Sequence, residues 1–209
     1  MPTDDLLGTL SDGSNDPDYC VCCLVNGDLK ASTIEEVIDI NVGFTDEFNK
    51  SAGTSYTHDE YRELLGQFIP TLKHWLSDDD KLGWVIDRTK RAVFTTIGGD
   101  GYPHSVEMDL LGSDGGCVLY FSTPSSSKKV MNIRENRKAG VCIARCWDSI
   151  SFTGDADTVD DRDLKERFWD DRMLRHYPGG IEDPAYCLIR FDGKHVSAWI
   201  DRDTFEKDL

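Results

Sequence analysis

The sequence has no long apolar run. No stretch approaches the roughly 18–20 uninterrupted apolar residues of a membrane-spanning helix. The first residues, Met-Pro-Thr-Asp-Asp, also lack the basic and then apolar order of a signal peptide. We therefore expect a cytoplasmic protein without a membrane segment.

Positive charge is scarce as well. Lysine and arginine together number 23, against 39 aspartate and glutamate residues, which gives a formal net charge of −16. Such a chain repels polyanions at long range, so binding of nucleic acid would need a concentrated basic patch. The basic clusters, at residues 88–91 and at Lys128-Lys129, are short. The charge therefore argues against a nucleic acid partner.

The cysteines do not form an even set. There are seven in a chain without an export signal, which favours reduced thiols over a disulfide framework. Cys20, Cys22 and Cys23 form a cluster, and a C-x-C pair can open an iron–sulfur or zinc site. No further cysteine follows before Cys117, so a complete four-thiolate site within residues 1–55 is excluded. We assign no metal, and an inter-chain or redox site stays open beside partly buried thiols.

A chain of 209 residues is long enough for one domain of ordinary size and an extension. Residues 1–55 are predicted to be an acidic extension that contains the cysteine cluster. Residues 56–209 are predicted to be the main domain, with a leading helix.

Two helices are predicted in the first third of the chain. Ser32 and Glu35 have the spacing of a capping box, which indicates a short helix that begins there. An apolar stripe over residues 57–76 predicts either a second helix kinked at Pro70 or two helices that abut there, because proline lacks an amide hydrogen. The acidic run at residues 78–80 is expected to end it.

From Ala92 onward the pattern changes to that of strands, with helices over residues 125–136 and 162–176. Seven strands are predicted, over residues 92–97, 102–111, 117–122, 139–146, 149–159, 186–191 and 195–200. The last two should form a hairpin around Asp192-Gly193. Cys117, Cys142, Cys146 and Cys187, within these strands, are expected to be small buried side chains. Short connections favour a closed antiparallel barrel, a mainly β fold with flanking helices.

The segment at residues 121–130 carries the chemistry. Serine hydroxyl groups, the amide groups of a helix N-terminus and the ammonium groups of Lys128 and Lys129 converge where a strand passes into a helix. A phosphate monoester needs these groups. The alternative is that the serines cap the helix and the lysines stay in solvent.

This segment resembles the pyridoxamine 5′-phosphate oxidase-like family, and within it the general stress protein branch of the FMN-binding split barrels. The matching residues are Phe121, Thr123, Ser127, Lys129, Val130, Ile133, Asn136 and the strand at 139–144. Further matches, in order along the chain, are Thr95-Thr96 with residues 101–105 and Met108, then Phe152-Thr-Gly154, and then Phe168-Trp169 with residues 177–180. The resemblance spans residues 80–200.

The resemblance implies an antiparallel split β-barrel with two FMN sites at a homodimer interface. It implies that the FMN phosphate is held by Thr123, Ser127, Lys128 and Lys129. It further implies that the flavin ring and ribityl chain run along Ser105, Val106, Glu107 and Met108. Trp169 either approaches the flavin from the partner subunit or packs in the core. Many relatives have arginine where this chain has Val106, which weakens the contact expected at that position.

The function implied is that of an FMN-dependent oxidoreductase with hydride transfer at flavin N5, and the substrate and any use of NADH or NADPH stay open. The alternatives are a flavin-binding or stress-related sensing protein without turnover, and a split barrel that binds haem or a deazaflavin. Vitamin B6 oxidation is not supported, because the arginine and proline pattern of true pyridoxamine phosphate oxidases is absent. No residue is assigned as catalytic. His104 could donate a hydrogen bond or move a proton near the flavin, or be a plain surface imidazole.

Overall fold

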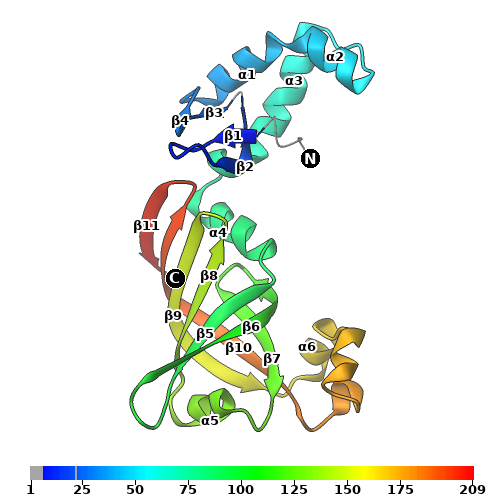
Figure 1. Cartoon of the computed structure of the whole chain (residues 1–209). Helices are drawn as coiled ribbons and strands as arrows, with labels where there is room; N and C mark the ends of the chain where they lie inside the picture. Colours follow the sequence, from blue (N-terminus) through cyan, green and yellow to red (C-terminus); the bar gives the residue numbers. More distant parts are fainter. Residues whose placement is uncertain (1–6, 22) are drawn as a thin grey trace. The chain divides into compact units, whose positions relative to one another are not determined.

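The computed structural model describes residues 7–21 and 23–209, and the chain divides into two compact units, Met1–Leu76 and Ser77–Leu209 (Figure 1). Each unit has a hydrophobic core of its own. The division falls later in the sequence than the boundary after residue 55 that we predicted from composition. The reason lies in the packing of the third helix.

The first unit combines short β-hairpins with helices. Strands β1 (Leu7–Thr9) and β2 (Asn15–Cys20) pair antiparallel, as do β3 (Leu24–Val25) and β4 (Asp28–Leu29). The helices are α1 (Ile34–Val42), α2 (Thr45–Ala52) and α3 (His58–Phe68), followed by the 3-10 turns η2 (Ile69–Thr71) and η3 (Lys73–Trp75). Tyr61 and Leu65 of α3 share one buried cluster with Val37 and Ile38 of α1. Helix α3 therefore belongs to the first unit.

The helix starts in this unit differ slightly from the predicted ones. Helix α1 is capped by Thr33, whose hydroxyl accepts from the Glu36 amide at 3.2 Å, one residue later than the predicted pair of Ser32 and Glu35. The backbone amide of Ser32 instead donates to the Glu36 carboxylate at 2.7 Å. Helix α3 stops at Phe68, ahead of Pro70, and two 3-10 turns follow, so the chain breaks at the proline and the alternative of one kinked helix is wrong.

The acidic run at residues 78–80 begins a helix instead of only ending one. These aspartates form the first turn of α4 (Asp78–Asp87), and the Ser77 hydroxyl accepts from the Asp80 amide at 3.2 Å. Carboxylates in a first turn are stabilised by the positive end of the helix dipole. We predicted no helix here, because the run was interpreted only as an end signal.

The second unit is an antiparallel barrel. Its strands are β5 (Arg91–Ile97), β6 (Pro103–Asp114), β7 (Val118–Pro124), β8 (Lys138–Arg145), β9 (Asp148–Val159), β10 (Tyr186–Ile200) and β11 (Asp203–Asp208). In the described chain they form a seven-stranded sheet in the order β11-β10-β7-β6-β5-β8-β9, and pairing of β10 with β9 closes it. The predicted fold class, a mainly β split barrel with flanking helices, is confirmed.

The hairpin predicted at Asp192-Gly193 is wrong. Strand β10 continues through these residues, with a bulge between Gly193 and His195, and the chain reverses instead at Asp201-Arg202. The close approach of Gly193 to Gly154 on β9 makes this possible, because a Cβ atom at Gly154 would lie 2.1 Å from the carbonyl oxygen of Asp192. One long strand can thereby pair with β7 and β9 first, and with β9 and β11 afterwards.

The helices of the second unit are short. Helix α5 (Lys128–Glu135) follows β7, and α6 (Arg162–Arg167) is followed by the 3-10 helices η4 (Asp171–Arg175) and η5 (Gly180–Glu182). The single helix predicted over residues 162–176 is broken, because the Asp170 carboxylate accepts from the Arg172 amide and starts a new turn. Among the helices of the described residues, none has the length and apolar character that crossing a bilayer requires.

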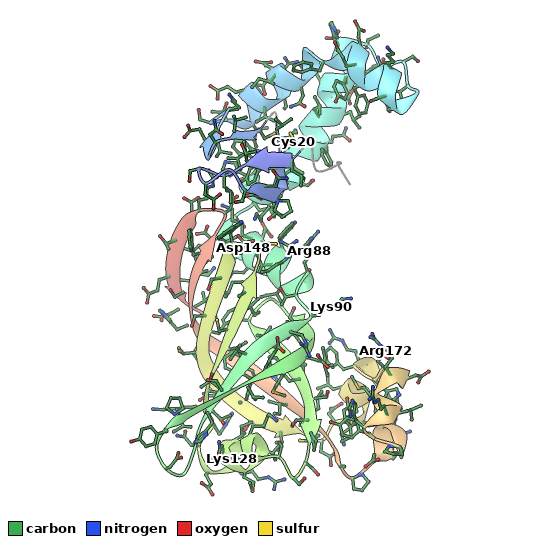
Figure 2. All side chains as sticks on the ribbon, viewed as in Figure 1. Cys20, Arg88, Lys90, Lys128, Asp148 and Arg172 are labelled. Atoms are coloured by element: carbon green, nitrogen blue, oxygen red, sulfur yellow. The ribbon has the colours of Figure 1, made fainter. Side chains whose placement is uncertain are left out.

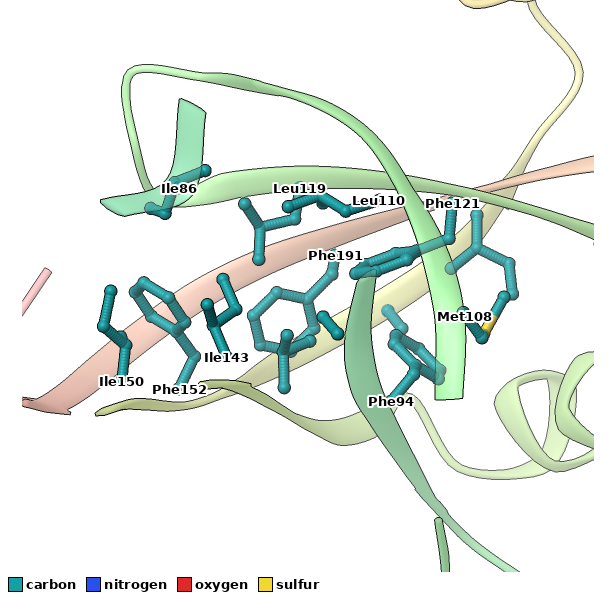
Figure 3. Close-up of a cluster of buried hydrophobic side chains, with 14 of the residues drawn as sticks. Ile86, Phe94, Met108, Leu110, Leu119, Phe121, Ile143, Ile150, Phe152 and Phe191 are labelled. Atoms are coloured by element: carbon teal, nitrogen blue, oxygen red, sulfur yellow. The ribbon is translucent and has the colours of Figure 1, made fainter. Parts of the chain in front are cut away.

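The barrel interior is filled with aromatic and branched side chains (Figure 3). Phe94 and Phe121 are fully buried with ring centroids 5.2 Å apart, and Phe191 and Phe152 continue the cluster. Cys187 is buried as predicted and Cys117 is partly buried, whereas Cys142 and Cys146 are exposed, which corrects the expectation for these two. Such a packed interior holds the strand ends, and the side chains on them, in fixed positions.

Candidate functional site

Hydroxyl and ammonium groups meet where β7 passes into α5. The Thr123 hydroxyl, 2% exposed, lies 3.2 Å from the Ser127 hydroxyl and accepts from the Lys129 ammonium at 2.9 Å. The turn is closed by the Ser127 amide, which donates to the Pro124 carbonyl oxygen at 2.9 Å. The residues predicted from the sequence to bind a phosphate are thus gathered in space.

The start of α5 has no side-chain cap. Ser127 occupies the N-cap position in extended conformation, but its hydroxyl makes no capping hydrogen bond and faces Thr123 instead. The alternative that the serine merely caps the helix is therefore not what the structure shows. Helix N-termini attract anions, because their amide groups point outward at the positive end of the helix dipole.

Lys129 is half-buried, and burial lowers the pKa of its ammonium group. No carboxylate forms an ion pair with it among the described residues, and the Thr123 hydroxyl is its hydrogen-bond acceptor. Lys128 is exposed at the same end of the barrel (Figure 2), with its ammonium 3.5 Å from Nδ1 of His104. The two ammonium groups therefore lie at one corner of the barrel, that of Lys129 half-buried and that of Lys128 in solvent.

The β6 residues predicted to contact a flavin lie on both faces of their strand. Ser105 and Glu107 point outward, where the Ser105 hydroxyl lies 2.8 Å from that of Thr95 and Glu107 pairs with Arg91 at 2.8 Å. Val106 and Met108 share the other face, since they pair with the buried Phe94 and Ala92. Met108 is part of the core, whereas Val106 is 41% exposed.

One edge of β6 is open at this level. Over residues 103–109 the strand pairs with β5, and in the described chain its pairing with β7 runs only from Leu110 to Asp114. The strands β6 and β7 therefore separate toward the end where α5 lies (Figure 1). This split leaves backbone groups of residues 105–108 available to a ligand.

Trp169 packs beside the start of β10 within one chain. Its ring meets that of Tyr186 edge-on, with centroids 5.3 Å apart, and a further contact joins Tyr186 to Tyr177 at 5.0 Å. Burial raises the pKa of Tyr177 to about 12. Trp169 thus packs in an aromatic cluster, and the prediction that it approaches a flavin across a dimer interface stays a prediction.

Sequence reasoning missed two contacts of the site. The Asn132 side-chain amide donates to the Thr96 hydroxyl at 2.8 Å, and both residues are buried, so this bond fixes α5 on β5. The imidazole of His104 lies between Lys128 and the Asp100 carboxylate. Only His104 could have been found from the sequence, because it follows Pro103 on the strand that was predicted to run along the flavin.

The cysteine cluster of the first unit lies in a turn after β2. The thiols of Cys20 and Cys23 are 3.3 Å apart, and the Cys23 amide donates to the Cys20 carbonyl oxygen at 2.9 Å. Cys22 lies outside the described residues. Within them, no group of three or more histidine, cysteine or acidic side chains is placed to hold a metal ion.

Comparison with protein families gives a match for each unit. Residues 77–206 match the pyridoxamine 5′-phosphate oxidase-like family, and residues 1–76 match a zinc ribbon domain, which sequence reasoning did not identify. A structural zinc site takes four ligands, and the described residues bring together two thiols. They do not fit a complete zinc site within one chain. Among curated proteins, none matches the chain.

Solved structures share the barrel fold. General stress protein 26 from Bacillus anthracis is 29% identical, with a TM-score of 0.55, over 63% of this chain and 98% of that protein. A protein related to general stress protein 26, from Clostridium acetobutylicum, is 24% identical with a TM-score of 0.56, over 64% and 97% of the two chains. An FMN binding protein from Nostoc punctiforme, 15% identical with a TM-score of 0.50 over 62% and 93%, is similar in fold. The resemblance to general stress proteins is thereby confirmed.

Proposed function

Because the chain belongs to the pyridoxamine 5′-phosphate oxidase-like family, matched over residues 77–206, we propose that it is an FMN-dependent oxidoreductase. In this proposal the second unit holds the FMN phosphate at the corner of Thr123, Ser127 and Lys129. The substrate is a small molecule of unknown identity, with NADH or NADPH as the possible electron donor.

The observation that carries the proposal is the half-buried Lys129 ammonium. It has given up part of its hydration, has a hydroxyl as its acceptor and, in the described chain, forms no ion pair with a carboxylate. A charged group in that state gains more from an anion than an exposed lysine does, because hydrogen bonds between charged groups are stronger where water is excluded. A phosphate would complete the site with the Ser127 hydroxyl and the open amide groups of α5.

The split between β6 and β7 is the proposed place for the rest of the cofactor. The row of His104, Val106 and Met108 runs along one face of β6 from the start of α5 to the barrel core, and Val106 is exposed midway. The open edge of residues 105–108 offers backbone donors and acceptors to the polar rim of a flavin, while Val106 offers an apolar surface. Val106 carries no charge, so in this proposal the two lysines carry the phosphate contact.

When bound, the flavin supplies the redox chemistry, because its N5 atom accepts or donates a hydride. The chain's contribution is to hold the phosphate, to orient the ring along β6 and to exclude water from one side of it through the packed core. No side chain of the described site is placed as an obvious acid or base over a ring at β6. We therefore assign no catalytic residue.

We also propose a homodimer, on the evidence of an uncharged outer face of the barrel. The centre of this face consists of residues that pair directly across β5, β8, β9 and β10: Val93, Thr95, Gly140, Cys142, Ala144, Ser149, Ser151, Thr153, Ser197 and Trp199. All are at least partly exposed, and none is charged, although 30% of the chain is. The border of the face carries ionisable side chains, namely His195 opposite Thr153, Glu107 opposite Val93, and the pair of Lys138 and Asp155. Small side chains make the face flat enough for a second copy to pack closely. Thr95 joins it to Ser105 of the proposed flavin site.

The absorbance spectrum of the purified protein, followed by titration with FMN, tests the proposal. Bound oxidised flavin gives bands near about 370 and 450 nm, whereas haem gives a band near about 400 nm. Anaerobic addition of NADH or NADPH should bleach the flavin bands, and an acceptor should restore them. Bound flavin that no donor reduces would support a binding or sensing protein instead, and a protein that does not take up FMN would overturn the proposal.

A further inference from the structure

We infer that His104 is part of the phosphate site and takes up a proton when the phosphate monoester binds. This inference rests on the proposed function, since it concerns the same corner. It assigns a role to an imidazole that neither the family match nor the phosphate segment accounts for.

His104 is held between groups of opposite charge. Its Nε2 lies 3.0 and 3.1 Å from the two oxygens of Asp100, and its Nδ1 lies 3.5 Å from the Lys128 ammonium, at the outer limit of a hydrogen bond. An ammonium group can only donate, so Nδ1 accepts from Lys128 and the proton of the neutral ring is on Nε2, directed at Asp100. The ring orientation is thereby fixed.

The surroundings keep the ring in place. A Cβ atom at Gly98 would lie 2.5 Å from Nε2 of His104, so the imidazole rests directly on the β5–β6 turn. In that turn the Asp100 carboxylate also accepts from the Tyr102 amide at 3.1 Å. The hydrogen bonds from His104 and from the Tyr102 amide lower the pKa of Asp100, and the charge of Lys128 lowers it further.

Two charged side chains contact His104, and a third lies near the turn on which the imidazole rests. Asp100 comes from the turn, Lys128 from the first turn of α5, and Glu135 from the end of α5, where its carboxylate would lie 3.4 Å from a Cβ atom at Gly99. In the empty site the Asp100 carboxylate faces Nε2 and the Lys128 ammonium faces Nδ1, where an added proton would meet a like charge.

A bound phosphate monoester changes the charge that Nδ1 of His104 faces. Lys128 is exposed on a long flexible side chain, and a dianion held at Ser127 and Lys129 attracts its ammonium away from His104. Nδ1 then loses the contact that kept it unprotonated and gains a neighbouring negative charge. The ring takes a proton from solvent at Nδ1 and becomes a cation between Asp100 and the phosphate.

The consequence is that the affinity for the phosphate group, and not that for the flavin ring, depends on pH. FMN and riboflavin differ by that phosphate, so the ratio of their dissociation constants isolates it. We expect the preference of the protein for FMN over riboflavin to increase about 5- to 10-fold from about pH 8.5 to about pH 6, since one unit of pKa shift is tenfold in affinity. The phosphate of free FMN itself titrates in this range, so a histidine-free variant must be compared.

The experiment is a fluorescence titration with FMN and with riboflavin at both pH values, on the full chain and on the variants His104→Asn and His176→Asn. His176 is an exposed imidazole of the same unit, outside the site. His104→Asn should lose most of the pH dependence of the ratio, and His176→Asn should keep it. Equal pH dependence in the full chain and in His104→Asn would overturn the inference while leaving FMN binding, and therefore the proposed function, intact.

Calorimetry on the unmodified chain makes the test independent of any variant. Binding of FMN near about pH 7 in buffers of different ionisation enthalpy measures the protons taken up, and riboflavin provides the reference. Uptake with FMN beyond that of the phosphate itself supports the inference, and no excess uptake refutes it. A chain that binds neither FMN nor riboflavin would refute the proposed function and this inference together.

Discussion

Lys129 is the residue on which FMN affinity should depend most. Replacement by alanine removes a half-buried ammonium with no competing carboxylate in the described chain, so we expect Lys129→Ala to weaken FMN binding by about 1.5–3 kcal/mol, or about 10- to 150-fold. Fluorescence titration measures the loss. Lys138→Ala, which removes an exposed lysine of β8, is the control and should leave the dissociation constant unchanged. An unchanged affinity in Lys129→Ala would place the phosphate elsewhere.

His195 should make the stability of the barrel depend on pH. Its Nδ1 lies 2.9 Å from the Asp208 carboxylate and its Nε2 lies 2.8 Å from that of Glu206, and these bonds raise the pKa of His195. A raised pKa in the folded state means that the contribution is complete below the unfolded value of about 6.5 and is lost as the pH rises through the folded pKa. The strand β11 is therefore held more firmly at the lower pH.

Thermal unfolding of the full chain and of His195→Gln tests this. The melting temperature of the full chain should exceed that of the variant by more at about pH 6 than at about pH 9. The difference in melting temperature between the two proteins at each pH is the controlled quantity, because all other titrating groups are common to both. A difference in melting temperature that is the same at both pH values would contradict the prediction.

The site could be predicted from the sequence where its residues are close together in the chain. Thr123, Ser127 and Lys129 span one strand end and one helix start, so local structure alone brings them together. The bond from Asn132 to Thr96 and the contact of Lys128 with His104 join residues 36 and 24 positions apart. Their pairing depends on how α5 docks on the barrel, which no local pattern encodes.

Gly154 should be the position in the barrel where an added side chain is most destabilising. It lies opposite Gly193 at the bulge of β10, and a Cβ atom there would be 2.1 Å from the Asp192 carbonyl oxygen, inside any contact distance. The clash is with backbone, so it can be relieved only by separating β9 from β10. We expect Gly154→Ala to lower the free energy of unfolding by at least about 2 kcal/mol.

Gly83→Ala is the matched control in the same unit. Gly83 lies inside α4, and a Cβ atom there meets nothing within 4 Å. Alanine loses less backbone entropy in a helix than glycine, so this variant should gain about 0.5–1 kcal/mol. Urea denaturation of both variants measures the two effects, and a Gly154→Ala protein as stable as the full chain would show that the barrel does not need this close approach.

At the level of elements, the strands β5 to β9 were predictable because each is an apolar or β-branched run between clear turn signals, whereas β11 and the short strands of the first unit were not predicted. At the predicted hairpin, a local signal is overruled by a tertiary contact. Asp192-Gly193 has the composition of a hairpin turn, but the glycine serves a strand bulge against Gly154. The actual turn at Asp201-Arg202 has positive φ angles at both residues and contains no glycine, so its sequence gave no signal.

At the level of the whole molecule, the barrel carries two features that a single chain leaves without a partner. One is the open edge of β6 beside α5, and the other is the uncharged outer face. The bond between Thr95 and Ser105 connects them, so a second copy on that face would lie next to the proposed flavin site. A substitution that breaks the proposed dimer should therefore also weaken FMN binding.

Ser151→Lys tests this connection. Ser151 lies inside the uncharged face, exposed and paired with Cys142 on one side and Ser197 on the other. A lysine there places one charge in each half of a symmetric interface, where it meets no opposite charge and must be desolvated. We expect the variant to be monomeric by light scattering after size exclusion, and to bind FMN at least about 10-fold more weakly although no phosphate contact has changed.

The control is Ser55→Lys, the same substitution at an exposed serine of the first unit, which should alter neither mass nor affinity. A monomeric Ser151→Lys protein that binds FMN as tightly as the full chain would separate the two features and show that each chain holds its cofactor unaided. A dimeric variant with normal affinity would place the interface on another surface. Either result can be read from the measured mass and dissociation constant, because the substitution lies outside the hydroxyl and ammonium corner at Thr123 and Lys129.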